Sequence, residues 1–458
     1  MKNIIAIRRE DLSKKRETRT PIVPSLAARI TAKGSRLLLQ PAINPDNQEI
    51  KRAFKDASFE GIGGEITEDI SEANVVLGVK EIEIQHISPS TAYYIFSHTH
   101  KGQKKNRKML QTFVEKKCTL IDYELIVNEK NIRHITAFTY YAGYAGMVDS
   151  LWALGQKLKA EGIVSRFQRL PQAIEKGDLA VLKDILREVK EEIIQKGTTM
   201  KMPPMIFCFL GNGKTSIGAQ EIFDSLPVIN ITPEQVTDVF VKGSRNFVYK
   251  LVLNIPDMFR LKTKTSAKIK EKYEKMNRRE KSDFYLASPA HFESNMDTFF
   301  PYITLFMNCI LWSPQYPRLF SREDTQKWYA KHKVLRVIGD ISCDPEGGVE
   351  FSHDTWIDDP IFTYHPETQT ETNGFAPSGI SVLAVTNLPC EFPADASAAF
   401  SRNMSEFMAG ITAADYEADT VAESGLPEAI KRAVILWKGE FTEKYAYMKE
   451  FLPQQEMA

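Results

Sequence analysis

The sequence predicts an α/β fold, in which short parallel strands alternate with helices. Apolar segments rich in branched and aromatic residues alternate with helix-like segments through residues 1–145, the pattern of a parallel sheet with helices on its faces. A second strand-led block opens with the apolar run at 205–210 and continues to about residue 360, and strand and helix signals return from about residue 374. At 458 residues, the chain is long enough for two or more domains with real cores.

The composition excludes several classes of function. The 59 Lys and Arg residues balance 59 Asp and Glu residues, so the net charge gives no reason to expect a nucleic-acid or membrane partner. No apolar stretch is long enough to span a bilayer, and the N-terminus lacks the apolar core and cleavage site of a signal peptide. The five cysteines are odd in number and far apart, which supports neither a zinc site nor a disulfide framework. We therefore expect a cytoplasmic protein without a metal.

The hydrophobic pattern predicts the elements of the first block. In chain order they are a strand at 4–8, a helix at 24–33, and strands at 36–39, 74–78, 93–95 and 119–122. A helix with one apolar face follows at 149–161. The clearest amphipathic helix spans 178–196, because an apolar stripe runs along it and Gly197 supplies the C-terminal stop.

The later elements follow in the same way. They are a strand at 205–210, a helix at 219–226, strands at 227–232 and 334–344, a strand at 380–385, and helical signals at 394–410 and 427–437. The stretch 262–281 is basic and poor in apolar residues, but Glu271, Glu274 and Glu280 interrupt its positive charge. It therefore indicates a solvated insertion helix rather than a nucleic-acid patch.

Ionisable side chains follow two of the predicted strands at the point where each strand ends. Lys80 and Glu81 come after the run 74–78, and His98 comes after the run 93–95. The carboxyl ends of parallel strands face the crevice in which α/β enzymes bind ligands. Burial lowers the pKa of a lysine and histidine titrates near neutral pH, so Lys80 and His98 form a candidate acid/base pair.

A glycine-rich loop connects the strand at 205–210 with the helix after it. The loop contains Gly211, Gly213, Thr215, Ser216 and Gly218. Glycines let the backbone turn sharply and approach a pyrophosphate, which then lies on a helix N-terminus. The spacing departs from Gly-x-Gly-x-x-Gly because Ser216 occupies the third position, and the loop also resembles a shortened Walker motif. A dinucleotide site and an ordinary strand-to-helix turn both remain open.

The next strand gives an indication about the cofactor. An acidic residue at its end would bind a ribose 2′-hydroxyl and repel a 2′-phosphate, but Asn230 and Thr232 stand at the end of 227–232. This favours NADP weakly, with NAD as the alternative. A strand end selected only for packing is an equally good interpretation.

Two further segments supply candidate site residues. The strand at 334–344 delivers Asp340 and Asp344 into a loop with two glycines, which fits the edge of a nicotinamide site, although such an aspartate is commonly only a turn former. The loop after the first strand contains Arg16 and Arg19. Either could hold a substrate carboxylate through two hydrogen bonds, and a solvated loop charge is the simpler alternative.

Several motifs, in chain order, resemble a known family. They are Ile7-Arg8-Arg9-Glu10, Lys80-Glu81, the run 96–103, Ile121-Asp122-Tyr123-Glu124, Tyr141-Ala142-Gly143, the run 218–223 and the run 339–344. Together they resemble the lysine-ketoglutarate reductase half of the bifunctional aminoadipic semialdehyde synthase. They are more distantly similar to alanine dehydrogenase and fungal saccharopine dehydrogenase. The dehydrogenase half of the bifunctional enzyme has no counterpart in this sequence, so a monofunctional reductase is expected.

The resemblance implies an architecture and a reaction. It implies two Rossmann-like, doubly wound domains: a substrate domain of 1–145 completed by 374–458, and a dinucleotide-binding domain of 146–373. It implies that the side-chain amine of lysine is joined to 2-oxoglutarate and the imine is reduced with NADPH, giving saccharopine. The expected partners are these small molecules, with no nucleic acid and no membrane, and a homo-oligomer is left open.

The resemblance also assigns roles to residues. Lys80 and His98 match the acid/base pair of the family, Arg19 the carboxylate-binding arginine, and Asp344 the aspartate beside the nicotinamide. Glu81 and Glu124 match acidic substrate-site residues. The residues expected at the cofactor, from the motifs and the resemblance together, are Gly211, Gly213, Thr215, Ser216, Gly218, Asn308, Asp340 and Asn387.

The sequence departs from the family pattern in two places. Thr386 stands where the family usually has Asp, and Thr139 stands where it usually has Gly. Both departures bear on the identity of the substrate more than on the fold. The alternatives are therefore another amino-acid or opine dehydrogenase on the same scaffold, and a non-catalytic dinucleotide-binding relative.

Overall fold

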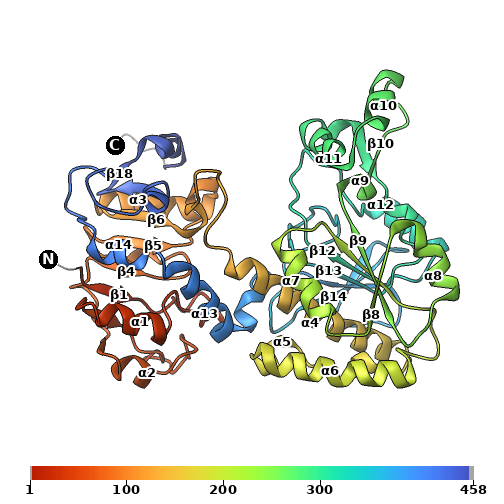
Figure 1. Cartoon of the computed structure of the whole chain (residues 1–458), viewed down its shortest axis with the longest axis horizontal. Coiled ribbons are helices and arrows are strands. Elements are labelled where there is room, and N and C mark those ends of the chain that lie inside the picture. The colour runs from red at the N-terminus through yellow and green to blue at the C-terminus, as the bar shows by residue number, and fades with distance from the viewer. Residues whose placement is uncertain (1–2, 453–458) are drawn as a thin grey trace. The chain divides into compact units, whose positions relative to one another are not determined.

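The computed structural model describes residues 3–452, and these divide into two compact units. Unit 1 contains the chain up to Phe138 and resumes at Pro393, and unit 2 runs from Thr139 to Phe392. Each unit is built on its own eight-stranded, mostly parallel sheet with helices (Figure 1). This confirms the predicted α/β class with two doubly wound domains. Among the described residues, no helix combines the length and apolar character needed to cross a membrane.

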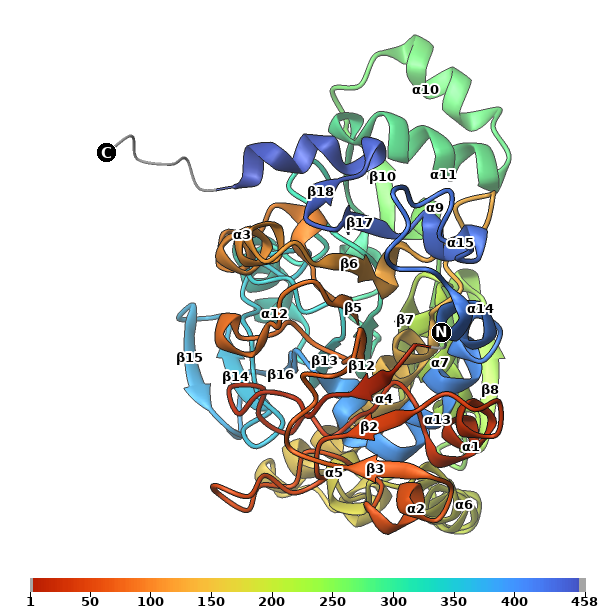
Figure 2. The same cartoon turned by 90° about the vertical axis from the view of Figure 1, so that its left-hand side faces the viewer.

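Unit 1 contains a sheet of strand order β18-β17-β6-β5-β4-β1-β2-β3, which can be followed from β3 to β18 in Figure 2. Its strands are β1 (Ile5–Ile7), β2 (Leu37–Leu39), β3 (Gly64–Ile66), β4 (Val75–Leu77), β5 (Ala92–Ile95), β6 (Thr119–Asp122), β17 (Val434–Trp437) and β18 (Glu440–Phe441). Strands β1 to β6 are parallel, and β17 joins β6 antiparallel. The C-terminal segment therefore completes the N-terminal sheet, as the sequence predicted.

The strands of unit 1 are buried on both faces, which explains their continuous apolar runs. Ile5 and Ile7 pack into one core and Ala6 packs into the other, because successive side chains of a strand point to opposite faces. The helices of this unit are α1 (Pro24–Thr31), α2 (Ala57–Glu60), α3 (Arg107–Glu115), α13 (Pro393–Met404), α14 (Met408–Ala413) and α15 (Glu428–Lys431).

Unit 2 contains a sheet of strand order β15-β14-β16-β13-β12-β7-β9-β8. Its strands are β7 (Ile206–Leu210), β8 (Val228–Ile231), β9 (Val248–Leu253), β12 (Leu305–Asn308), β13 (Val337–Asp340), β14 (Ile361–His365), β15 (Thr370–Asn373) and β16 (Ile380–Leu383). Six neighbouring strands of this sheet are parallel: β16, β13, β12, β7, β9 and β8. Strands β14 and β15 continue the sheet beyond β16 in antiparallel orientation.

The helices of unit 2 include one, α6, whose two ends were predicted from the local sequence. They are α4 (Ala137–Ala160), which begins at the end of unit 1, then α5 (Ala173–Lys176), α6 (Leu179–Lys196), α7 (Lys214–Phe223), α8 (Val236–Lys242), α9 (Ile255–Met258), α10 (Ala267–Glu274), α11 (Arg278–Ala287) and α12 (Arg322–Lys331). The amphipathic helix predicted at 178–196 is confirmed as α6, with Asp178 accepting from the first-turn N–H groups and Gly197 ending it.

The structure differs from the sequence predictions in four places. Residues 434–437, in the stretch 427–437 expected to be helical, form strand β17, which pairs with β6. Helix α7 begins at Lys214 rather than 219, because Gly213 already has the extended backbone of an N-cap residue. The basic stretch 262–281 forms parts of two helices, α10 and α11, beside a two-stranded sheet of β10 (Phe259–Leu261) and β11 (Phe292–Ser294). Residues 374–392 belong to unit 2 rather than to the substrate domain, because β16 pairs with β13 and β14.

The strand order around the glycine loop bears on the cofactor preference predicted from the strand at 227–232. The strand that follows α7, β8, does not return beside β7, because β9 lies between them and pairs with both. Asn230 and Thr232, from which a cofactor preference was predicted, therefore belong to an outer strand and the turn after it.

A buried carboxyl pair connects three segments of unit 2. Asp149 on α4 accepts a hydrogen bond from the backbone of Ala173 (2.7 Å), and Glu391 accepts one from the backbone of Ile174 (3.1 Å). Glu391 ends the short helix η9 (Leu388–Glu391), which follows Asn387. Burial raises the pKa of both carboxyl groups, and the charge of Asp149 raises the pKa of Glu391 further. The pair therefore binds a proton more readily than ordinary carboxyl groups do.

We predict that this pair makes the folded protein less stable as the pH rises. A carboxyl group whose pKa is raised on folding binds more protons in the folded than in the unfolded state, so the free energy of unfolding falls as pH rises above the ordinary carboxyl range of about 4. Glu391→Gln retains a hydrogen-bond partner for Asp149 and removes the repulsion. The melting temperature of the wild type should fall more steeply between pH 5 and pH 8 than that of Glu391→Gln, and equal slopes would exclude the pair as the cause.

Candidate active site

The loop after β4 is held by a buried carboxylate from the loop after β1. Glu10 accepts hydrogen bonds from the backbone N–H groups of Val79 (2.7 Å) and Lys80 (2.9 Å). Burial raises the pKa of Glu10, although Arg8 and these two hydrogen bonds oppose that effect. Among residues 3–452, the half-buried ammonium group of Lys80 has no ion pair or hydrogen bond. The backbone of Lys80 is therefore fixed while its amine stays available for chemistry.

The loop after β5 is held in the same way by Asp122 at the end of β6. Its carboxylate accepts from the backbone N–H of Ser97 (2.9 Å), the hydroxyl of Ser97 (2.6 Å) and the backbone N–H of His98 (3.2 Å). His98 has a left-handed backbone with φ of 51°, a conformation that non-glycine residues rarely adopt. Burial alone would raise the pKa of Asp122, but the nearby His100 ring and the hydrogen bonds from Ser97 outweigh it and lower this pKa.

Glu81 connects the two loops. Its carboxylate lies 2.7 Å from Nδ1 of His98 and 2.7 Å from Nζ of Lys14. Burial would raise the pKa of Glu81, but the hydrogen bonds and charges of His98 and Lys14 hold it well below its usual range. A permanent carboxylate on Nδ1 orients the imidazole and leaves Nε2 for another partner. Glu81, predicted as a substrate residue, thus also positions His98.

Arg19 reaches the same region through an aromatic cluster. Its guanidinium lies 4.1 Å from the centre of the Phe138 ring, and Phe96 packs against both Phe138 (5.8 Å) and His98 (6.3 Å). Glu17 is fully buried and accepts from Nε and Nη2 of Arg19. The Nε and Nη2 donors of this buried guanidinium are therefore bound to Glu17, and a contact of Arg19 with a substrate carboxylate stays a prediction.

Glu124 is placed differently from the prediction. Its carboxylate forms ion pairs with Lys101 (3.0 Å) and Arg133 (2.7 Å), and Nε2 of His100 lies 3.6 Å away. Burial would raise the pKa of Glu124, but these cations lower it. Its negative charge is therefore already balanced within unit 1.

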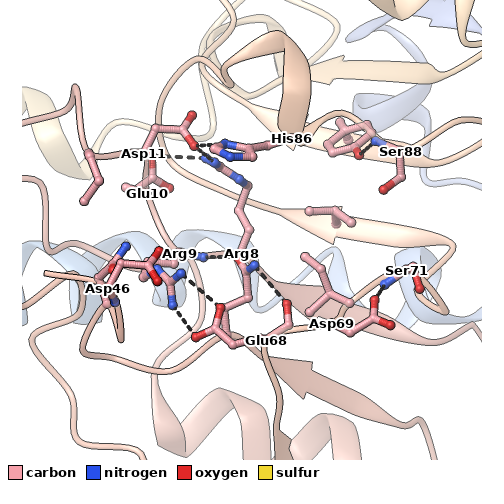
Figure 3. Close-up of a pocket in the computed structure, with 16 residues that line it drawn as sticks. Arg8, Arg9, Glu10, Asp11, Asp46, Glu68, Asp69, Ser71, His86 and Ser88 are labelled. Carbon is pink, nitrogen blue, oxygen red and sulfur yellow. Dashed lines mark hydrogen bonds and ion pairs between the residues drawn. The ribbon is translucent and has the colours of Figure 1, made fainter. Parts of the chain in front are cut away.

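A cavity of about 310 Å³ lies on the other side of the β1 loop (Figure 3). Arg8 crosses it and donates to Asp11 (2.5 Å), which also contacts Nδ1 of His86 (2.6 Å). The ligand atoms of Asp11, Glu83 and His86 lie within 4.8 Å of one another. However, the guanidinium of Arg8 already occupies the carboxylate of Asp11, so the group forms an ion-pair network in which a metal ion would compete with a fixed cation.

In unit 2, the glycine loop after β7 contains glycines with two different roles. Gly211 has φ of +78°, and Gly213 is exposed, with nothing within 4 Å of the position a Cβ would take. A Cβ on Gly218 would lie 2.4 Å from the carbonyl oxygen of Tyr140 on α4. Gly213 thus leaves open space at the N-terminus of α7, as a pyrophosphate requires. Gly211 serves the left-handed turn, and a Cβ on it would lie 2.6 Å from Cγ2 of Ile310, whereas Gly218 allows α4 and α7 to approach closely.

The two polar residues of the loop, Thr215 and Ser216, also pack against other groups of unit 2. Ser216 is fully buried, and its hydroxyl accepts from Nε2 of Gln220 (3.1 Å). The carbonyl oxygen of Thr215 lies 2.1 Å from the Cβ position of Gly143 on α4. Ser216 and Gly218 therefore pack α7 within unit 2, and their predicted contact with the cofactor stays a prediction.

The ends of β12 and β13 carry the remaining polar groups. Asn308 and Asp340 are paired in register, and Nδ2 of Asn308 donates to Asp340 (2.8 Å). Burial raises the pKa of Asp340 to about 6, although the nearby Ser352 and the hydrogen bond from Asn308 oppose that effect, and burial also raises the pKa of Asp344. Asn387 follows β16, and its amide donates to Sγ of Cys390 (2.7 Å).

The donor set at these strand ends fits a dinucleotide. Oδ1 of Asn308, Oδ2 of Asp344 and Nε1 of Trp312 are buried without a hydrogen-bond partner among the described residues. Buried polar atoms are rarely left unpaired unless a ligand or water completes them. A carboxamide offers both a donor and an acceptor to such atoms, so a nicotinamide fits their chemistry, with the pyrophosphate expected at Gly211 and Gly213.

Sequence reasoning missed the residues that hold the site loops. Glu10, Asp122 and Glu17 act on backbone groups or on another side chain, so no spacing rule identifies them. The available signal was position, since Glu10 and Asp122 both lie at or just beyond the carboxyl end of a buried parallel strand.

Comparisons with known proteins bear on the family and the fold of this chain. Residues 6–145 match the model of the alanine dehydrogenase/PNT N-terminal domain, and residues 317–444 match that of the C-terminal domain. The solved structure of an L-alanine dehydrogenase superposes with a TM-score of 0.61 at 15% identity, covering 97% of this chain and 98% of that chain. This likeness confirms the Rossmann-like fold.

Three curated relatives extend the comparison. The chain is 35% identical over 451 residues to an alpha-aminoadipic semialdehyde synthase of Arabidopsis thaliana, covering 94% of this chain and 40% of the relative. It is 30% identical over 470 residues to the mitochondrial enzyme of that name in Mus musculus, covering 99% and 48%. A saccharopine dehydrogenase [NAD(+), L-lysine-forming] of Neurospora crassa is 22% identical over 77% of this chain and 79% of its own length. The chain spans less than half the length of the two synthases.

Proposed function

The chain belongs to the alanine dehydrogenase/PNT family, and we propose that it joins the side-chain amine of L-lysine to 2-oxoglutarate with NADPH as reductant, giving saccharopine. The observation that carries this proposal is that Glu81, next to Lys80 in the loop after β4, contacts His98 in the loop after β5. The two loops therefore meet at the carboxyl ends of neighbouring strands of unit 1. The synthases that are 30–35% identical to nearly the whole chain support the choice of substrates. Location in the cytoplasm and a homo-oligomer stay predictions.

The proposed chemistry requires proton transfers at two atoms. The lysine amine must lose a proton before it attacks the keto carbon of 2-oxoglutarate, and the resulting hydroxyl must gain one to leave as water. We propose that His98, which Glu81 orients, and Lys80 exchange these protons, and that Arg19 holds a carboxylate of the oxo acid. When bound, the nicotinamide cofactor supplies the hydride that reduces the imine carbon.

The residues of unit 2 orient the cofactor in this proposal. Gly211 and Gly213 accept its pyrophosphate at the start of α7, and Asn308 with Asp344 meets its carboxamide. Asp340 holds the amide of Asn308. NADPH is proposed over NADH, with the NAD-named relative from Neurospora crassa as the reason to test both.

A second candidate is another amino-acid or opine dehydrogenase. Two observations favour it: the charge of Glu124 is already balanced by Lys101 and Arg133, and exposed Thr386 replaces a carboxylate that the family usually has. Both reduce the negative charge available for a diamine such as lysine.

We predict that the purified protein oxidises NADPH only when lysine and 2-oxoglutarate are both present. Absorbance at the reduced-nicotinamide band is followed with lysine, ornithine, alanine and ammonia, each with 2-oxoglutarate, and saccharopine is identified by mass spectrometry. Faster turnover with ornithine, alanine or ammonia than with lysine would establish the second candidate instead.

We predict that Lys80→Met and His98→Gln each lower kcat by at least about 100-fold, the usual contribution of a positioned acid or base. Neither change touches the glycine loop, so the affinity for NADPH, measured by fluorescence titration, should stay within about twofold of wild type, and the double variant should lose less than the product of the single losses.

Matched controls are Lys33→Met, at an exposed lysine of unit 1, and His86→Gln, at a histidine bound to Asp11. Both controls should retain wild-type kcat. Near wild-type kcat in Lys80→Met or His98→Gln would show that the pair is structural.

A further inference from the structure

The strand beside the glycine loop is β9, and this changes where the adenosine end of a dinucleotide is recognised. The N–H of Gly211 donates to the carbonyl oxygen of Leu253 (2.8 Å), so β7 and β9 end side by side. Neighbouring strands lie about 4.8 Å apart, which places the residues after Leu253 next to the loop and β8 one strand further out. In doubly wound folds, the group that reads the ribose 2′ position stands at the end of this neighbouring strand.

The segment after β9 carries a prepared cation. Asp257 on α9 is almost buried, accepts the N–H of Asn254 (3.0 Å) and forms an ion pair with Nη2 of Arg278 (2.5 Å) at the start of α11. The Arg278 side chain is 63% exposed, so most of its donors face solvent while Asp257 holds one edge. The hydrogen bond that Arg278 donates to Asp257 raises the pKa of Arg278. The guanidinium is therefore fixed, charged and accessible.

The chain segment that contains Arg278 carries an excess of positive charge, while the carboxylates that act on its guanidinium are those of Asp257 and Glu234. Residues 257–281 contain ten Lys and Arg residues against four Asp and Glu residues. Figure 1 shows α9, β10, α10 and α11 grouped together beyond the end of β9. The charge of Arg278 already neutralises the carboxylate of Asp257, which would otherwise repel a phosphate. A phosphate on the ribose would thus meet an attractive field and a guanidinium able to donate two hydrogen bonds.

We propose that Arg278, positioned by Asp257, recognises the 2′-phosphate of NADP(H) and sets the preference of this protein for NADP(H) over NAD(H). This inference rests on the proposed function, because it requires that unit 2 binds a nicotinamide dinucleotide. It transfers cofactor selection from Asn230 and Thr232 on the side of β8 to the insertion that follows β9.

Binding of cofactor and fragments to the full chain tests this proposal without any catalytic turnover. NADPH and NADH are titrated by fluorescence, and adenosine 2′,5′-bisphosphate and 5′-AMP by calorimetry. Arg278→Ala should raise the Kd of NADPH and of the bisphosphate by at least about 10-fold, the effect of losing a charge-assisted contact. The Kd values of NADH and 5′-AMP should stay within about twofold.

The controls separate the possible failures. Arg279→Ala removes an adjacent exposed arginine of α11 and should leave all four Kd values unchanged, whereas Arg278→Glu should reverse the preference toward NADH. Wild-type NADPH affinity in Arg278→Ala, or an equal loss for NADPH and NADH, would overturn the assignment of Arg278. A wild-type protein that binds neither NADPH nor NADH would instead overturn the proposed function.

Discussion

The geometry of unit 1 depends on buried carboxylates that accept backbone N–H groups at the ends of parallel strands. Glu10 holds Val79 and Lys80, and Asp122 holds Ser97 and His98. A buried carboxylate is costly unless hydrogen bonds satisfy it, so each loop and its carboxylate stabilise one another. This mutual requirement keeps His98 in a left-handed conformation and fixes the backbone from which Lys80 extends. The proposed acid/base side chains of Lys80 and His98 can then remain available while the backbone around them is held by hydrogen bonds.

Unit 2 uses close backbone approach for the same purpose. Glycines 143 and 218 allow α4 and α7 to touch through Thr215 and Tyr140, which fixes the start of α7 and with it the open loop at Gly213. At the neighbouring strand ends, Asp340 holds the amide of Asn308, whose oxygen stays unpaired and buried. The cofactor residues proposed here are therefore placed by strand register and helix packing rather than by flexible loops, which keeps the cost of ordering low on binding.

Features that depend on the local sequence could be predicted, whereas features that depend on tertiary contacts could not. The parallel strands, helix α6 with its Asp178 and Gly197 ends, and the placement of Lys80 and His98 at strand ends follow from periodicity and position. The position of β9 between β7 and β8 could not be predicted from the sequence, because strand order depends on pairing between distant segments. The packing role of Gly218 and the balanced charge of Glu124 were missed for a related reason: each is determined by a partner remote in sequence or in another element.

The central claim is that a buried carboxylate places the acid/base pair, and the kcat of Asp122→Asn tests it most directly. The asparagine has nearly the same shape but only one acceptor oxygen and no negative charge. It cannot accept the Ser97 and His98 groups on one oxygen and the N–H of Glu124 on the other, so the His98 loop should shift. A displacement of about 1 Å at a reacting group can lower the rate about 100-fold. We predict a fall of that order in kcat with an unchanged Kd for NADPH. A kcat equal to that of the wild type would contradict the account.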